Sequence, residues 1–260
     1  MASHIQIPVS APGYRPNLTF SEYHREAKKI GELGKFSLAL EMHIWYHNHC
    51  LEYCPSLVGV RLSYALRDWM DLTEVYPPAL DALIRIRNEK TSLIINGAQN
   101  KSLFQDVRSI NRYLDEVDLS IQLFKEMEGS SPSLAKECWW MIKDEFFRIK
   151  EVETIRRYSP DLTTEIDEMT HVLANHREFM LRKKKELDEG KRTSNRDNGF
   201  RDFFSKCHLD FIEYEANEFI SKAKLLLEII LKMGNVPEAY RLRNRILEFI
   251  DSEEIRNSLK

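Results

Sequence analysis

The chain has 260 residues, of which 43% are hydrophobic and 30% charged, and this balance excludes a disordered protein and allows a sizeable core. Lys and Arg total 38 against 41 Asp and Glu, so the formal net charge of -3 disfavours a dedicated nucleic-acid-binding protein. With only 9 Gly and 9 Pro, few tight β-turns can form, and the composition indicates long helices with short connections.

The N-terminal residues 1–18 contain three prolines and little hydrophobic periodicity, which predicts an extended arm. They lack a basic start followed by an apolar core, so we expect no secretory signal. The apolar run Leu225–Leu231 is interrupted by Glu228 and is too short to span a bilayer, so no membrane partner is expected. Four cysteines without a disulfide framework fit a reducing compartment, and we expect a cytoplasmic protein.

From Thr19 onward, apolar residues recur at helical spacing, and short breaks divide the chain into roughly ten antiparallel helices. We therefore predict an all-α fold. The longest polar stretch, GKRTSNRDNG at 190–199, predicts a loop between a helical-repeat region at 19–189 and C-terminal hairpins of the same superhelix at 200–260. The breaks fall near Gly34, Pro55, Tyr76–Pro78, Asn96, Asp115, Gly129–Pro132, Ser159, Gly190–Gly199 and Gly234.

Four segments share one pattern, in which a short turn precedes an aromatic residue or Val, then a small residue, then a large residue four positions later. The segments are LGKFSLALEMHIWY (33–46), TEVYPPALDALIRI (73–86), LDEVDLSIQLFKEM (114–127) and KMGNVPEAYRLRNRI (232–246). Their small residues are Ala39, Ala79, Ser120 and Ala239. The first two intervals are therefore 40 and 41 residues, and the last spans about three such periods. A small residue here lets one helix approach its hairpin partner closely.

This pattern resembles the tetratricopeptide repeat, and the segment from Cys50 to Leu83 is also similar to uncharacterised bacterial proteins of this type. The period departs from the family's ~34 residues, so these hairpins would be longer. Arg67 and Arg108 stand where the family prefers a small residue, and residues 133–215 match poorly. The resemblance implies antiparallel hairpins stacked as an α-solenoid.

A tetratricopeptide-like solenoid would bind a partner peptide or helix in a groove lined mainly by the first helix of each hairpin. The family's clamp for a peptide carboxylate needs Lys and Asn one turn apart, but His24 and Lys28 stand at those positions, so that specificity is not expected here. Trp45 lies opposite the apolar face of its helix, and an aromatic side chain at such a position is a candidate for a partner interface. The candidate partner-binding residues are Lys28, Arg67, Arg108, Asn111 and Trp45.

Histidines and cysteines recur at helical intervals in HIWYHNHCLEYC, residues 43–54. On a helix, His47, Cys50 and Cys54 fall within about 40° of His43, so all four share one narrow stripe. His43 and Cys54 would lie ~16 Å apart along the axis, so one zinc ion cannot use the whole stripe, although a pair could bind with ligands from another helix. The stripe is the middle of the apolar face, which favours the hydrophobic core over a metal site.

Other clusters carry weaker signals. Glu168 and His171 match half of a di-iron carboxylate pattern, and without a second such motif they are typical of a polar helix face. The adjacent Trp139 and Trp140 cannot both face one core, so one of them is expected at a helix seam or on a partner surface. The basic residues of LRKKKELDEGKR at 181–192 are diluted by carboxylates, which disfavours a phosphate-binding patch.

The sequence contains no P-loop, dinucleotide fingerprint, GxSxG elbow or CxxC pair, so no cofactor is expected and no constellation argues for catalysis. We therefore favour a scaffold or adaptor that binds an unidentified protein or peptide partner. The first alternative is a helical metalloprotein or enzyme that uses His43, His47, Cys50 and Cys54. The second is a nucleic-acid-binding solenoid, which the net charge of -3 disfavours.

Overall fold

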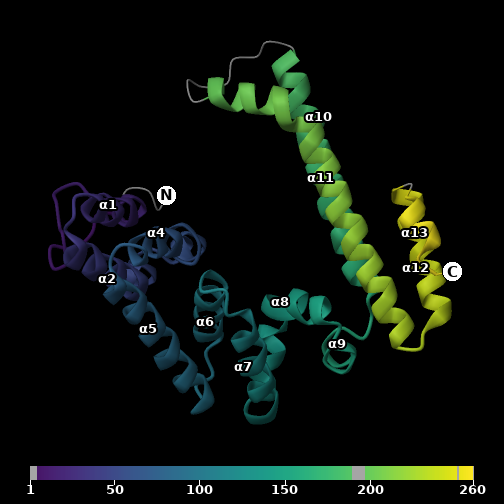
Figure 1. The fold of residues 1–260 in the computed structure, drawn as a ribbon, viewed down its shortest axis with the longest axis horizontal. Coiled ribbons are helices and arrows are strands. Elements are labelled where there is room, and N and C mark those ends of the chain that lie inside the picture. The colour runs from purple at the N-terminus through teal and green to yellow at the C-terminus, as the bar shows by residue number, and fades with distance from the viewer. Residues whose placement is uncertain (1–4, 189–196, 251, 260) are drawn as a thin grey trace. The chain divides into compact units, whose positions relative to one another are not determined.

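The protein is described from a computed structural model, which covers residues 5–188, 197–250 and 252–259 (Figure 1). Within these ranges the chain folds into helices without any strand, and the one isolated β-bridge joins Gln6 and Thr19. The prediction of an all-α fold is thus confirmed. The helices form two compact units, Met1–Ile142 and Lys143–Lys260, and the division falls inside a helix and not at the polar loop of 190–199.

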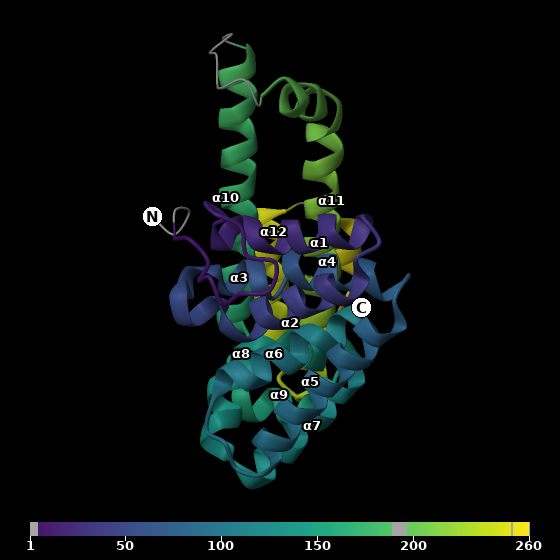
Figure 2. The ribbon, with the colours of Figure 1, turned by 90° about the vertical axis from the view of Figure 1, so that its left-hand side faces the viewer.

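The first unit consists of hairpins whose neighbours along the chain contact each other. α1 packs on α2, α4 on α5, and α6 on α7, while α4 also contacts both α1 and α6. Figure 2 shows α1, α2 and α4 gathered at one end of this unit. The helices are α1 (Phe20–Glu32), α2 (Phe36–Tyr53), α3 (Val58–Arg61), α4 (Tyr64–Thr73), α5 (Pro77–Ile95), α6 (Lys101–Tyr113), α7 (Val117–Ser130) and α8 (Pro132–Ile149), with a 3-10 turn at Pro55–Leu57.

The small residues of the repeat pattern lie near the starts of α2, α5, α7 and α12 (Val236–Phe249), and all four are buried. The long period has a structural cause, because α2 and α5 are 18 and 19 residues long and residues 54–63 add a 3-10 turn and α3 between hairpins. Burial of Ala39, Ala79, Ser120 and Ala239 is what the pattern predicts.

The turns that precede α2, α7 and α12 share a backbone conformation, which the turn before α5 does not have. Gly34, Asp115 and Gly234 have positive φ and stand five residues before the buried small residue. In each turn the next amide donates to the carbonyl five residues back, as Lys35 does to Ile30 at 3.1 Å, which satisfies an orphan carbonyl at the helix end.

The same turn joins α8 to α9 (Val152–Tyr158), within the region where the sequence pattern fails. Lys150 has a φ of 54°, the amide of Glu151 donates to the carbonyl of Phe146, and Ile155 is fully buried five residues after Lys150. Because a Lys replaces the turn residue and an Ile replaces the small residue, sequence alone did not reveal this hairpin.

The expected N-terminal arm is folded back onto α1 and α2. Ile7 and Ala11 are buried in the same cluster as Met42, and the hydroxyl of Tyr23 donates to the carbonyl of Pro12 at 2.6 Å. Gly13 has a φ of 64°, and a side chain there would collide with Met42. The arm therefore contributes to the core.

The second unit contains a long antiparallel hairpin, whose helices run side by side in Figures 1 and 2. They are α10 (Thr163–Asp188) and α11 (Asp197–Lys232); α12 packs on both, and α13 (Glu253–Asn257) packs on α11 and α12. Residues 189–196 of the predicted polar loop lie outside the described residues, whereas 197–199 are the first residues of α11.

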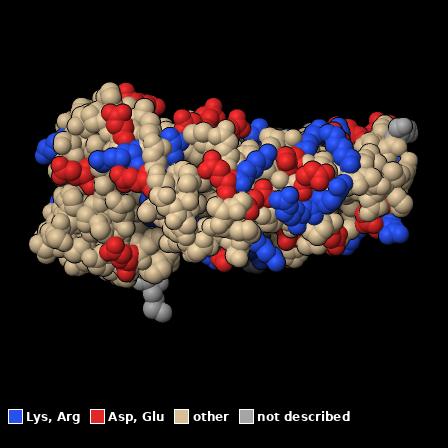
Figure 3. All heavy atoms as spheres, turned by 90° about the horizontal axis from the view of Figure 1, so that it is seen from below, with Lys and Arg blue, Asp and Glu red and all other residues tan. Residues whose placement is uncertain are grey.

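Two features of the whole described chain bear on its partners. No helix in the described ranges combines the length and the apolar character needed to cross a bilayer. On the face drawn in Figure 3, Lys and Arg side chains are interspersed with Asp and Glu. That mixture fits the net charge of -3 and favours no continuous path for a phosphate backbone on this face.

Candidate functional site

The His and Cys stripe of α2 points into the first unit. His43, His47, Cys50 and Cys54 are between 0% and 4% exposed, as the helical spacing predicts. Burial raises the pKa of the Cys50 thiol to about 12, so it stays protonated at neutral pH. Among the described residues, no three His, Cys, Asp or Glu side chains are placed to hold a metal ion together.

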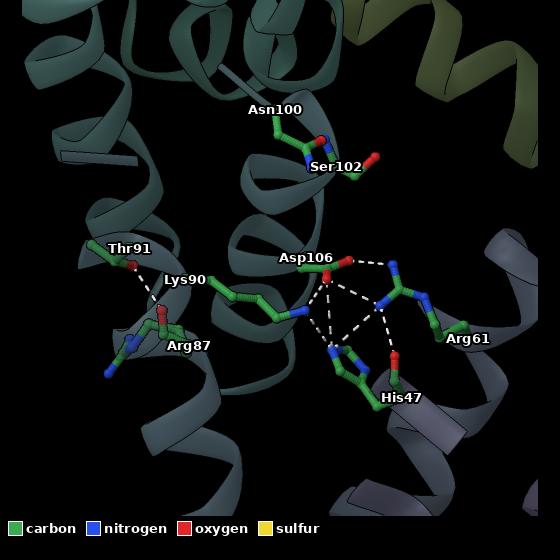
Figure 4. Close-up of polar contacts among 8 residues, drawn as sticks. All are labelled: His47, Arg61, Arg87, Lys90, Thr91, Asn100, Ser102 and Asp106. Carbon is green, nitrogen blue, oxygen red and sulfur yellow. Dashed lines mark hydrogen bonds and ion pairs between the residues drawn. The ribbon is translucent and has the colours of Figure 1, made fainter. Parts of the chain in front are cut away.

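His47 belongs to a buried ionic cluster that gathers four helices (Figure 4). The two terminal guanidinium nitrogens of Arg61, on α3, donate to the two carboxylate oxygens of Asp106, on α6, and Nη1 lies 3.0 Å from Oδ2. Nζ of Lys90, on α5, donates to the same Oδ2. Nη1 of Arg61 also donates to the backbone carbonyl of His47 at 3.2 Å. We call these four residues the ionic cluster.

The ring of His47 is neutral in this cluster. Its Nε2 lies 3.4 Å from both Nη1 of Arg61 and Nζ of Lys90, and because those groups only donate, Nε2 accepts. Burial, followed by the charge of Lys90, lowers the pKa of His47 to about 3. The 3.7 Å approach of Nε2 to Asp106 is therefore not an ion pair at neutral pH.

Asp106 carries the negative charge of the cluster. Burial alone would raise its pKa, but the hydrogen bonds and charge of Arg61, with the charge of Lys90, hold the pKa below its ordinary value. Two buried cations thus share one carboxylate, and the cluster ties α2, α3, α5 and α6 together. The sequence offered one signal for it, because Asp106 is a carboxylate on the apolar face of α6, between Phe104 and Val107.

Asn111 lies in the interior of the first unit and not at its surface. It is fully buried, its Oδ1 accepts from Nη1 of Arg87 at 2.7 Å, and its Nδ2 donates to Oγ of Ser120 at 3.0 Å. Arg87 also donates to Glu116 at 2.6 Å. These bonds join α5, α6 and α7, so Asn111 does not belong to a partner-binding surface in this structure.

The other candidate partner-binding residues are distributed over several surroundings. Arg67 is exposed, with its guanidinium carbon 5.1 Å from the ring centroid of Tyr64. Arg108 is half-buried on α6. Trp45 is half-buried and its ring packs on those of Phe20 and Tyr23. These three side chains and Lys28 come from four different helices, α4, α6, α2 and α1.

Lys28 is part of a polar junction between α1 and α4. Its Nζ lies 2.5 Å from Oδ2 of Asp71 and 3.7 Å from Oδ1 of Asp68. Asp68 is buried, and its Oδ2 lies 2.7 Å from Nδ1 of His24. The charge pairs of Lys28 raise its pKa, Asp71 contributing most, so the side chain is cationic at neutral pH.

An apolar groove of about 600 Å³ lies in the second unit, between the end of α8 and the hairpin of α10 and α11. Lys143 is one of the residues that line this groove, and its Nζ donates to Glu165 at 2.6 Å and to Glu168 at 3.3 Å. The apolar wall is formed by Phe147, Met169, Val172, Leu173, Phe219, Leu225 and Leu226. The charged rim contains Lys143, Asp144, Arg148, Glu165, Glu168, Glu215, Glu218 and Lys222. We call this the α10–α11 groove.

Two motifs flagged in the sequence can now be placed. Glu168 and His171 are both exposed on α10, and Glu168 is bonded to Lys143, which fits a polar helix face. Trp139 is buried at 7% exposure, whereas its neighbour Trp140 is 62% exposed, so the two rings do point to different surroundings as adjacent helical residues must.

Comparisons with known proteins found no counterpart: no protein-family model matches the chain, and neither a curated protein nor a solved structure matches it significantly. The resemblance to tetratricopeptide repeats therefore depends on the residues and turns described above. The function must be argued from the geometry of the chain itself.

Proposed function

We propose that the protein is a tetratricopeptide-like interaction module, a scaffold or adaptor without catalysis, that binds an amphipathic helix of a partner protein in the α10–α11 groove. The observation that carries the proposal is the groove itself, where seven apolar side chains line a space of about 600 Å³ under a charged rim. Ligand sites in proteins have volumes of roughly 300–1,000 Å³ and mostly apolar walls.

The repeat features support the module part of the proposal. Five helix ends, including the α5 end at Asn96–Ala98, place an amide on the carbonyl five residues back, and three buried small residues, Ala39, Ser120 and Ala239, follow such hairpin turns at matching positions. α8, which supplies one wall of the groove, is the first helix of the hairpin that turns at Lys150. In a tetratricopeptide-like stack the first helices are the ones that face a partner.

The shape and chemistry of the groove favour a helix as occupant. The apolar wall comes from three helices, and helix-in-groove recognition uses apolar anchors at positions i, i+3, i+4 and i+7 of the partner. Val172 lies in this wall and is 50% exposed, so apolar surface is available to cover. Burying apolar surface contributes roughly 25 cal/mol per Å² before the costs of association.

The charge of the rim specifies the partner further. Five carboxylates and three cations surround the groove, so the rim has an excess of negative charge. A partner helix with Lys or Arg beside its apolar face complements that excess, which accelerates association and excludes acidic helices.

A selection from a displayed library of random-sequence amphipathic helices tests the proposal. The purified full chain serves as bait, and Val172→Glu serves as the counter-selection bait, because it places a charge in the apolar wall. We expect the wild-type bait to enrich helices with apolar anchors at helical spacing and flanking Lys or Arg. A selection that enriches no such sequence, or enriches the same sequences on both baits, would contradict the proposal.

A further inference from the structure

The α10–α11 hairpin is longer than the helices that pack on it. α10 has 26 residues and α11 has 36, so they are about 39 Å and 54 Å long, whereas the 14 residues of α12 span about 21 Å. Figure 1 shows α12 and α13 beside the end of α11 that leads into them, while the other end of the hairpin extends beyond both. We call residues 176–188 and 197–210 the hairpin tip. Two paired helices cover one stripe of each other, so any further apolar face at the tip needs another partner.

The sequence of α11 carries two apolar stripes, which lie roughly 120° apart around the helix. The first is buried in the second unit and contains Phe219, Ala223, Leu226 and Ile230. The second recurs at alternating intervals of four and three residues and contains Phe200, Phe204, Cys207, Phe211 and Tyr214. Glu218 and Leu225 continue that series and line the α10–α11 groove, so the register of the second stripe extends the groove face into the tip.

Described side chains of the hairpin leave apolar surface uncovered. Val172 and Phe179 stand seven residues apart, two turns along α10, and are 50% and 43% exposed, and Tyr214 on α11 is 60% exposed. The guanidinium carbon of Arg182 lies 5.7 Å from the ring centroid of Phe179, and both Arg182 and Lys185 are exposed. The tip of α10 therefore has the chemistry that the groove favours, which is an apolar anchor flanked by Lys or Arg.

We infer that the partner helix is supplied by a second copy of this chain, whose hairpin tip docks antiparallel in the α10–α11 groove. This inference rests on the proposed function and names the occupant of the same groove. With a two-fold axis near Asn175, Phe179 of each copy lies beside Val172 of the other. One turn further along each helix, Arg182 lies beside Glu168, whose side chain is 62% exposed. Each copy thus supplies one anchor and one groove, and both pairings occur twice.

The charges and the dimensions of the hairpin favour this antiparallel arrangement. The groove rim has five carboxylates and three cations, whereas the sequence of the α10 tip, LRKKK at 181–185, has four consecutive basic residues. An antiparallel pair places each basic tip beside the acidic rim of the other copy, while a parallel pair would place like charges together. A hairpin face about 39 Å long and about 20 Å wide offers roughly 800 Å², which is what one partner of a standard interface buries.

Sedimentation velocity of the full chain over a range of concentrations is the first measurement. We expect wild type to convert from monomer to dimer as its concentration rises. Phe179→Glu should weaken the dimer about a hundredfold, because a charge that costs roughly tenfold at one docking site occurs at both sites of a two-fold interface. Wild type that stays monomeric, or Phe179→Glu that dimerises as tightly as wild type, would overturn the inference.

Tyr240→Glu is the matched control. Tyr240 is 42% exposed on α12, outside the groove, and the guanidinium carbon of Arg243 lies 4.9 Å from its ring centroid, much as Arg182 lies near Phe179. Because both aromatic residues are exposed, each variant should remain folded, which circular dichroism checks. Tyr240→Glu should dimerise as tightly as wild type, and a loss equal to that of Phe179→Glu would overturn the assignment of the interface to the hairpin.

A charge exchange tests the register of the two copies. In a homodimer Arg182→Glu places two carboxylates together at both sites, so it should dimerise more weakly than wild type. Glu168→Arg places two guanidinium groups together at both sites, with the same result. In an equimolar mixture of the two variants, both sites of a heterodimer again pair one carboxylate with one guanidinium. We expect the mixture to regain dimer, and no gain over the separate variants would overturn this pairing.

The same measurements separate the inference from the proposed function. A monomeric wild type that still selects basic amphipathic helices would overturn the inference alone. A hairpin dimer whose dilute, dissociated chains select no such helix would overturn the binding of a separate partner and leave the dimer intact. A helix selected on the wild-type bait should dissociate the dimer, because it occupies the same groove. A dimer that such a helix leaves undisturbed would show that the second copy docks elsewhere.

Discussion

The ion pairs of the two units differ in how far they are removed from water. In the first unit the side chains of Arg61 and Asp106 are each 4% exposed, and Lys90 joins them. In the second, Lys150 and Glu228 lie 2.5 Å apart with side chains 37% and 44% exposed. Buried charges join hairpins at one defined register, whereas exposed charges can rearrange around a partner. The buried cluster therefore fixes how the helices of the first unit pack, whereas the Lys150–Glu228 pair of the second unit lies at its surface.

The largest effect should come from removing the shared carboxylate. Asp106→Ala leaves Arg61 and Lys90 buried without a counter-ion, so the free energy of unfolding should fall by about 3–5 kcal/mol. Glu228→Ala, its matched change in the second unit, should cost about 0–1 kcal/mol. Urea denaturation of both variants measures the difference, and similar losses would remove the distinction between the units.

Acid should weaken the first unit before its carboxylates titrate. The pKa values of His43 and His47 are lowered from 6.5 to about 3, so the unfolded chain binds more protons than the folded one between these values. Stability must then decline as pH falls from about 6.5 toward 3. Asp106 adds to the loss at lower pH, because its pKa in the folded chain lies below the ordinary value of an aspartate.

His43→Phe tests this pH dependence, since it keeps a ring against Trp69 and removes one titrating group. We expect the decline in unfolding free energy between pH 7 and pH 5 to be smaller in the variant than in wild type. The control is His49→Phe at a half-buried position of the same helix, which should preserve the decline. An unchanged slope in His43→Phe would show that this histidine is not held neutral by burial.

An intermediate effect is expected at the second polar network. Asn111→Ala removes the amide that bonds Arg87 and Ser120, and leaving buried partners unsatisfied costs about 1–3 kcal/mol. Asn244→Ala, on the exposed face of α12, should change the unfolding free energy by less than about 0.5 kcal/mol. Equal effects would indicate that Asn111 does not tie α5, α6 and α7 together.

The smallest effect should come from the repeated turn. Gly34 has a φ of 75°, so Gly34→Ala should cost about 1 kcal/mol through backbone strain alone, because nothing crowds the added methyl group. Gly59 lies in α3 without a positive φ, and Gly59→Ala should be neutral or slightly stabilising. Thermal unfolding distinguishes the two, and a neutral Gly34→Ala would contradict the assignment of this turn.

Some of this architecture could be predicted from sequence and some could not. The buried small residues and the His and Cys stripe follow from helical periodicity, which is a local property. The contacts of His47 with Arg61 and Asp106 join positions 14 and more residues apart, and no local pattern pairs them. Lys150 was missed because its positive φ is imposed by the turn and not by a residue type that favours it.

Among the candidate functional residues, too, some could be predicted from the sequence and others could not. Lys28 was expected from its repeat position, but its partners Asp68 and Asp71 emerge only when α1 packs on α4. Glu168 was noticed for a metal motif and instead belongs to the rim of the α10–α11 groove. A groove depends on how three helices come together, so its wall could not be recognised from apolar residues that read as ordinary core positions.

The affinity of a selected helix for two matched variants tests the central claim most directly. Val172 is 50% exposed in the wall of the α10–α11 groove, and Val236 is 48% exposed at the start of α12, outside it. By fluorescence anisotropy, Val172→Glu should weaken binding of the labelled helix about tenfold or more, which corresponds to about 1.4 kcal/mol, while Val236→Glu leaves the affinity unchanged. Equal affinities for wild type and Val172→Glu would contradict docking in this groove.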